Sequence, residues 1–421
     1  MQSRSDLDLG SSRCPAPLDI LFVGYGDWHL WNWDGFRTRS AQLCRFLARS
    51  DRVGRLFVLN EPIYLRRSQP GFSVPRWDRF RKLPLRGGAR RTEEQVVLLD
   101  PSRFLAGPDW LKRPYVVRML RRELEKWKSR PVLWVANVHK AYLMHEIEAR
   151  MRVFDAIDDW DSVPEYRRYA ERIRAGYETV LEHADLIYTV SRHLQEKLRP
   201  RARTRQVHQL PNGVDLDLFC EPAQEPSARR ISRKERRPLL TYVGVLSDRF
   251  DMDLLARVAG DWPACRIRLI GPVGSDVEKR FKTIRRLPNV EWTGLVHHSR
   301  IPEFLRDSDV LLIPHKESSL SRSMDPLKLY EYLTTGLPIV STPVPPVEEF
   351  SSWVYIGSGD GFSRRVGEAL EEPSRADSGL LWQGRIEEAK RHGWDIRVRQ
   401  IVWDLERVGD IASQRDGGVP D

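Results

Sequence analysis

The sequence has few cysteines and no long apolar run. Four cysteines occur in 421 residues, and the wide spacing of Cys14, Cys44, Cys220 and Cys265 forms no metal-binding pattern and predicts reduced thiols. No apolar run approaches the ~20 residues that cross a bilayer. The opening stretch MQSRSDLDLGSSR lacks the apolar core of a secretory signal. We therefore expect a cytoplasmic protein.

Acidic residues are also fewer than basic ones. The chain has 69 Lys and Arg against 59 Asp and Glu, a net charge of +10. Much of the excess lies in residues 76–91, RWDRFRKLPLRGGARR, and 113–130, RPYVVRMLRRELEKWKSR. Basic residues interleaved with apolar ones suit an anionic membrane surface, although a solvated basic face or a nucleic-acid partner fits the same composition. Because no nucleic-acid-binding signature is present, we expect peripheral attachment to the inner membrane face and no nucleic-acid partner.

Strand-like and helix-like segments alternate along both halves of the chain. The expected strands of the first half are 18–26, 53–62, 95–100, 131–139, 151–160 and 184–191, with helices at 39–50 and 164–183. Those of the second half are 238–247, 265–274, 289–296, 308–315, 336–342 and 352–357, and helical spacing returns at 380–413. Residues 221–238, rich in Pro, Glu, Ser and Arg, mark a composition break. The rhythm predicts an α/β protein with two doubly wound, Rossmann-like domains.

Such sheets bind ligands beyond the carboxyl ends of their strands, so the cleft between two facing domains is the expected site. Several strand-end residues of the second half, Gly244, Gly271 and His315, are candidates there.

The stretch SMDPLKLYEYLTTGLPIVST, residues 323–342, predicts a short helix followed by a buried strand. We expect Asp325 to cap the helix and Pro326 to be its first residue. Lys328 then lies in the first turn, where the helix dipole disfavours a cation unless an anion is bound there. Glu331 lies three residues on, on the same face. Lys328 could hold a diphosphate while Glu331 accepts from a ribose diol; a plain surface pair is the alternative.

The first half carries a glycine-containing loop, GYGDWHLWNWDGF, at residues 24–36. Glycines such as Gly26 let a backbone approach a ligand, but His29 stands where a dinucleotide-binding fingerprint requires its third glycine. Trp28, Trp31 and Trp33 could form a platform for a sugar ring or an acceptor lipid, or could pack as a lid or core.

A second polar loop follows the strand in VFDAIDDW, residues 153–160. Asp158 could accept a proton from an acceptor or stabilise a positive sugar transition state, and Asp155 is a second candidate. A helix cap or a structural hydrogen bond is the alternative for each. His139, at the end of the neighbouring strand, could bind a substrate hydroxyl.

Six segments of the second half resemble, in order and spacing, glycosyltransferase family 4 and its GT-B relatives. They are LPNGVDLDLF, LTYVGVLS, IRLIGPV, NVEWTGLV, SDVLLIPH and PLKLYEYLTTGLPIVST. The chain is most similar to bacterial enzymes that build exopolysaccharides and teichuronic-type polymers. The resemblance implies an acceptor-binding domain (1–206), a donor-binding domain (207–395) and a last helix (396–421) that returns to the first domain. It also implies a nucleotide-sugar donor and no metal or other cofactor.

The resemblance assigns roles by position. Glu331 matches the second glutamate of the family's E-x7-E motif, which holds the donor ribose, and Lys328 matches the basic residue of the PxKxxEY variant. Gly244 falls in the loop near the donor phosphates, and Leu295 and Val296 match the segment beside the base. The donor-binding set is completed by strand-end and helix residues: Gly271, His315, Leu329 and Arg249.

The sequence departs from the family pattern at charged positions. Ser323 stands in place of the first motif glutamate, and Val245 and Phe250 stand where an arginine and a lysine are usual, which leaves Arg249 as the nearest substitute. We expect a metal-independent glycosyltransferase that moves a sugar from a nucleoside-diphosphate sugar to a glycan or lipid-linked acceptor. The resemblance favours retention of anomeric configuration. A non-catalytic nucleotide-sugar-binding paralogue and an NAD-dependent oxidoreductase are the alternatives.

Overall fold

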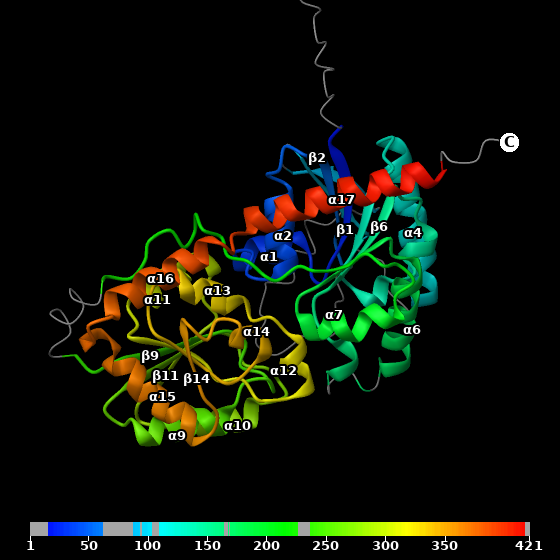
Figure 1. Cartoon of the computed structure of the whole chain (residues 1–421). Coiled ribbons are helices and arrows are strands. Elements are labelled where there is room, and N and C mark those ends of the chain that lie inside the picture. The colour runs from blue at the N-terminus through cyan, green and yellow to red at the C-terminus, as the bar shows by residue number, and fades with distance from the viewer. Residues whose placement is uncertain are drawn as a thin grey trace, which may run out of the picture.

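The computed structural model describes residues 16–61, 87–92, 95–102, 109–163, 167, 169–225 and 236–416. Two α/β domains lie side by side, each built on its own sheet (Figure 1). Twelve predicted strands are present, six in each sheet, so the expected α/β architecture with two Rossmann-like domains is confirmed. Among the described helices, none is long and apolar enough to cross a membrane.

The first sheet has eight strands in the order β3-β4-β2-β1-β5-β6-β7-β8. They are β1 (Leu18–Val23), β2 (Val53–Leu59), β3 (Gly88–Arg91), β4 (Val96–Asp100), β5 (Val132–Val135), β6 (Met151–Ala156), β7 (Leu186–Thr189) and β8 (Val207–Gln209). Neighbouring strands are parallel except β3 and β4. The carboxyl ends of the parallel strands therefore meet at one edge, where the predicted loops after β1, β5 and β6 lie.

Helices cover both faces of this sheet. The helices are α1 (Trp28–Asp34), α2 (Arg39–Leu47), α4 (Asp109–Lys126), α5 (Leu143–Glu146), α6 (Ala170–His183) and α7 (Arg192–Leu198). Alternation along β1 sends Leu21 into the apolar cluster under α4 to α7, and Phe22 into the cluster under α1 and α2. Buried strands with apolar residues on both faces are typical of a parallel sheet between two helical layers.

The second sheet is entirely parallel, in the order β11-β10-β9-β12-β13-β14. Its strands are β9 (Leu239–Val243), β10 (Arg266–Ile270), β11 (Val290–Gly294), β12 (Val310–Ile313), β13 (Ile339–Ser341) and β14 (Val354–Ile356). The helices around it are α9 (Met252–Asp261), α10 (Glu278–Ile284), α11 (Ile301–Arg306), α12 (Ser319–Ser323), α13 (Leu327–Leu333), α14 (Pro345–Glu348), α15 (Asp360–Glu371) and α16 (Ser378–Lys390). One apolar cluster lies under α9, α10 and α15, and another under α11, α13 and α14.

The last helix, α17 (Trp394–Asp416), leaves the second domain and lies across the first (Figure 1). Trp394, Ile401 and Leu405 share an apolar cluster with Leu43 of α2. The hydroxyl of Tyr188 in β7 donates to the Asp404 carboxylate at 3.0 Å. The helix therefore covers the first sheet, as the family resemblance implied.

Some local predictions were wrong. Pro326 is the residue before α13 rather than its first residue, and the Asp325 carboxylate does not cap the helix. That carboxylate instead accepts from the backbone N–H of Asn212 at 2.6 Å and from the Tyr330 hydroxyl at 3.0 Å. The edge strands β3 and β8 and the helix α1 were not predicted, because each is short and polar or aromatic rather than periodic. Two predicted features, basic residues 76–86 and most of the composition break (226–235), lie outside the described residues.

Candidate functional site

Glycines end three strands of the second sheet at its carboxyl edge. Gly244, Gly271 and Gly294 follow or end β9, β10 and β11 and all have positive φ, at 148°, 139° and 79°. A Cβ at Gly271 would lie 2.0 Å from the Gly244 carbonyl oxygen, and one at Gly244 would lie 3.0 Å from Lys328 Nζ. Glycine is therefore required here so that the two loops and the lysine can approach one another.

The Lys328 side chain points to this edge of the sheet. Its ammonium donates to His315 Nε2 at 3.0 Å and to the Tyr242 hydroxyl at 3.3 Å, and lies 4.6 Å from the centre of the Tyr242 ring. Burial and the neighbouring Lys328 charge lower the pKa of His315 well below its usual range. A neutral imidazole can accept a hydrogen bond from the Lys328 ammonium, so His315 positions the Lys328 side chain.

The environment of Lys328 disfavours its charge. Burial, opposed by Glu331 and assisted by Arg249, lowers the pKa of Lys328 to about 7. A buried ammonium with so little compensating charge gains stability when an anion binds beside it. Perturbed lysines of this kind are frequent in functional sites.

Arg249 and Asp158 join the two domains directly. Arg249 follows β9 in the second domain, and Asp158 follows β6 in the first. Arg249 Nη2 donates to Asp158 Oδ2 at 2.5 Å. The Asp158 backbone is fixed by the Tyr177 hydroxyl, which donates to its carbonyl at 2.9 Å. Two residues predicted for different subsites, one for the donor and one for the chemistry, therefore meet where the domains face each other.

Ser323 also lies at the contact between the domains. It is fully buried, its backbone carbonyl accepts from the Ser191 hydroxyl at 2.7 Å, and its own hydroxyl lies 3.5 Å from Asp159 Oδ2. Lys197 holds the Asp159 carboxylate at 2.7 Å. A short side chain at 323 therefore fits beside a carboxylate of the first domain, where a glutamate would bring a second negative charge.

Glu331 is paired with a residue that the sequence analysis did not single out. Its Oε1 lies 2.7 Å from Nε2 of His298, and both side chains are largely buried. Neither the family pattern nor local spacing identifies His298, because the pair joins two segments 33 residues apart.

Asp155 does not reach the site. Its side chain is fully buried and accepts from Arg39 Nη2 at 2.8 Å. Arg39 also donates to the Asn212 side chain at 3.1 Å, and Asn212 in turn donates to Asp325. The predicted catalytic role of Asp155 is therefore not supported, because the alternation along β6 turns this carboxylate into a buried ion pair with Arg39 inside the first domain.

The predicted tryptophan platform is largely wrong as well. Trp28 and Trp31 are 6% and 2% exposed and pack in the core of the first domain, whereas Trp33 is 40% exposed. Gly26 is required by this packing, since a Cβ there would lie 2.8 Å from the Trp31 indole nitrogen.

Other aromatic rings lie after the strands of the first sheet. The rings of Tyr25 and Trp160 are 4.5 Å apart, and those of His139 and Tyr169 are 6.5 Å apart. Tyr25, His139 and Trp160 follow the neighbouring strands β1, β5 and β6, so they share the carboxyl edge of the first sheet with Asp158.

The remaining donor-side candidates divide into two kinds. Leu295 and Val296 are partly buried just after β11, near the Gly271 and Gly294 backbone. Leu329 is fully buried in the core beneath α13, so its side chain does not contribute to a ligand site.

Among the described residues, no group of three or more His, Cys, Asp or Glu is arranged to hold a metal ion.

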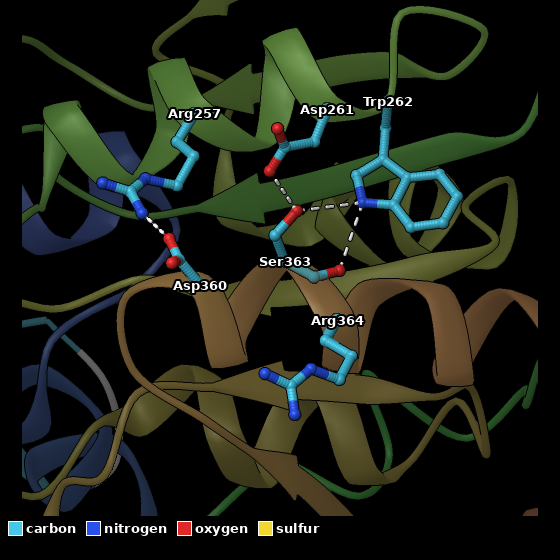
Figure 2. Close-up of a pocket in the computed structure, with 6 residues that line it drawn as sticks. All are labelled: Arg257, Asp261, Trp262, Asp360, Ser363 and Arg364. Atoms are coloured by element: carbon cyan, nitrogen blue, oxygen red, sulfur yellow. Dashed lines mark hydrogen bonds and ion pairs between the residues drawn. The ribbon is translucent and has the colours of Figure 1, made fainter.

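An open pocket of about 470 Å³ lies elsewhere, between α9 and α15 (Figure 2). Arg257 pairs with Asp360 across it, the Ser363 hydroxyl donates to Asp261 at 2.6 Å, and the Trp262 indole donates to Ser363. Its polar groups largely bind one another, and it contains none of the predicted site residues. The strand-end residues, not this pocket, form the candidate site.

Two parallel-sheet domains with facing strand ends and a returning last helix define the GT-B fold. Residues 237–371, in the second domain, match the family model described as Glycosyl transferases group 1. Bacillus subtilis (strain 168) TuaH, provisionally named a teichuronic acid biosynthesis glycosyltransferase, is 27% identical over 214 residues, which cover 48% of this chain and 53% of TuaH. The chain thus spans about half the length of that relative.

Solved structures extend the similarity in fold to almost the whole chain. Sucrose-phosphate synthase from Thermosynechococcus elongatus superimposes with a TM-score of 0.67 at 14% identity, covering 96% of this chain and all of that one. Anabaena HepE in complex with UDP-glucose gives a TM-score of 0.63 at 14% identity, covering 93% of this chain and 100% of HepE.

Proposed function

We propose that this chain is a glycosyltransferase that moves a sugar from a nucleoside-diphosphate sugar to a glycan or lipid-linked acceptor in the synthesis of a cell-surface polysaccharide. The observation that carries the proposal is the placement of Lys328, beside Gly244 at the carboxyl edge of the second sheet. The match of residues 237–371 to the group 1 glycosyltransferases and the similarity to TuaH support this class of activity and of product.

The leaving group would be held by side chains of the second domain. As the glycosidic bond breaks, negative charge grows on the departing diphosphate, and Lys328 and Arg249 supply positive charge to stabilise it. We propose that these cations do the work without a metal ion. Anabaena HepE, which has the same fold, is known in complex with UDP and with UDP-glucose, which supports a nucleotide sugar as donor.

The first domain would bind the acceptor. The Tyr25 and Trp160 rings, with His139 and Tyr169 beside them, offer aromatic faces on which a sugar ring can stack. Asp158 lies at the same edge and can accept the acceptor proton or stabilise the positive charge on the transferred sugar. The family resemblance favours retention, and we propose a retaining reaction with Asp158 as the electrostatic partner.

We further propose that α4 attaches the protein to an anionic membrane surface. Its exposed basic residues are Arg113, Arg118, Arg121, Arg122 and Lys126. Leu111, at the start of the helix, is 48% exposed. Binding to vesicles with and without anionic lipid tests this, because an electrostatic contact is lost as salt is raised.

The proposed activity is tested by screening nucleotide sugars for donor hydrolysis and for transfer to lipid-linked acceptors. Wild type should release a nucleoside diphosphate, and Lys328→Ala should bind that product more weakly. Equal affinity of wild type and Lys328→Ala for UDP and for GDP would overturn the proposed donor site.

A further inference from the structure

His298 contacts the carboxylate of Glu331. It is only 5% exposed, and its Nε2 lies 2.7 Å from Glu331 Oε1. The ring also packs 5.6 Å from that of Phe219, which is itself buried. His298 follows the loop after β11, so a residue from one loop fixes the conformation of a carboxylate on α13.

The backbone of His298 lies close to the first domain. Gly35 ends α1 with φ 85°, and a Cβ at this position would lie 2.9 Å from His298 Cβ and 3.0 Å from His298 N. Only a residue without a side chain allows α1 to approach the second domain so closely. The loop that carries His298 therefore packs closely against the end of α1 in the first domain.

A carboxylate has two oxygens, and His298 binds one of them. With Oε1 fixed, the carboxylate plane cannot rotate freely, and Oε2 keeps a defined direction. Binding sites gain affinity and selectivity when the groups that touch the ligand are held by such neighbouring hydrogen bonds. A vicinal diol, which offers two hydroxyl donors at fixed spacing, profits most from a carboxylate that is already oriented.

We propose that His298 is a positioning residue that orients Glu331 for the ribose diol of the donor nucleotide, and thereby selects ribonucleotides over their 2′-deoxy counterparts. The inference rests on the proposed function and identifies the ribose diol as the group of the donor that the His298–Glu331 pair recognises. His298 does not touch the ligand in this scheme; it acts through Glu331.

The test compares the affinities of UDP and 2′-deoxy-UDP by calorimetry. Wild type is expected to prefer UDP about tenfold, which corresponds to ~1.4 kcal/mol. His298→Phe keeps the ring volume but has no donor, and should reduce this preference to near unity. His298→Gln places an amide N–H close to the position of Nε2 and should restore it. His193→Phe, the same substitution at an exposed position of α7, is the matched control and should keep the wild-type ratio.

A merely structural role would lower both affinities equally and leave their ratio unchanged, and this result in a folded His298→Phe protein would overturn the inference. So would a wild type that binds UDP and 2′-deoxy-UDP equally. If His298→Phe does not fold, His298→Asn serves instead, since its shorter amide cannot reach Glu331; an unchanged ratio in it has the same meaning. A wild type that binds neither nucleotide refutes the proposed function.

Discussion

Arg249 of the second domain donates to Asp158 of the first at 2.5 Å, so the cation expected to bind the donor diphosphate is paired with the carboxylate expected to act on the sugar. Both side chains are partly accessible, at 34% and 11%. A diphosphate that binds Arg249 competes with Asp158 for it. Donor binding and exposure of the Asp158 carboxylate are therefore linked through one guanidinium group.

Substitution at the two ends of this pair should have opposite effects on nucleotide binding. Asp158→Asn removes the competing charge, so UDP affinity is expected to hold or rise while sugar transfer falls about a hundredfold or more. Arg249→Ala should weaken UDP binding about tenfold to a hundredfold, because a charge-assisted hydrogen bond contributes ~1.5–3 kcal/mol. Calorimetry and a transfer assay measure the two effects. Arg257→Ala, in the open pocket between α9 and α15 of the same domain, is the control and should leave UDP binding unchanged. Weaker UDP binding by Asp158→Asn than by wild type would contradict the proposed competition for Arg249.

Nucleoside diphosphate binding should be accompanied by proton uptake. Lys328 has its pKa lowered to about 7 by burial, so most of the amine is neutral at pH 8 in the absence of ligand. A bound diphosphate favours the ammonium, and the site then takes up close to one proton at pH 8, where the diphosphate itself is fully ionised. Titration calorimetry in buffers of different ionisation enthalpy measures this number. Lys328→Arg, which is always charged, should abolish the buffer dependence, whereas its persistence would assign the proton elsewhere.

The sequence was sufficient to predict the two sheets, because buried parallel strands have a strong apolar signal. Glycines at the ends of β9 and β10 marked the edge where Lys328 lies, and the structure explains them by direct contact. These are properties of segments a few residues long, and local patterns record them.

The hydrogen-bond and ion-pair partners of the polar residues could not be predicted from such local patterns. Asp155, in β6, and Asp158, in the loop that follows it, lie three residues apart, yet one is buried against Arg39 and the other contacts Arg249. His298 contributes through a contact with Glu331 that only the fold creates. For Trp28 and Trp31 the sequence left two alternatives open, a binding platform and packing in the core, and only the structure shows that α1 directs both into the core.

Asp155 is expected to matter for stability rather than for catalysis. Asp155→Asn leaves the Arg39 charge buried without its counter-ion, and breaking a buried pair in this way costs about 3–5 kcal/mol of the free energy of unfolding. Urea denaturation measures the loss. Asp217→Asn is the control, because its carboxylate is 90% exposed near Arg49 and should change stability by less than about 1 kcal/mol. A stable Asp155→Asn protein that has lost only sugar transfer would restore the catalytic interpretation.

The charge state of His298 should report its contact with Glu331. Burial alone would lower the pKa of His298, but the Glu331 carboxylate and its hydrogen bond raise it above the usual value, with Asp215 adding to the effect. Asp34 of α1 also faces the ring, and Lys328 faces Glu331 from the same helix. A raised folded-state pKa stabilises the protein below pH ~6.5, and this contribution is lost as pH rises through the folded-state value.

Glu331→Gln should therefore lower the pKa of His298, because burial then acts unopposed by the carboxylate charge. The same substitution should reduce the fall in the free energy of unfolding as pH rises above neutral. Histidine ring resonances in NMR spectra, assigned by comparison with His298→Gln, measure the pKa through a pH titration. Glu303→Gln, on the exposed face of α11, should leave the titration unchanged. A His298 pKa that stays the same in Glu331→Gln would mean that the carboxylate does not control the imidazole.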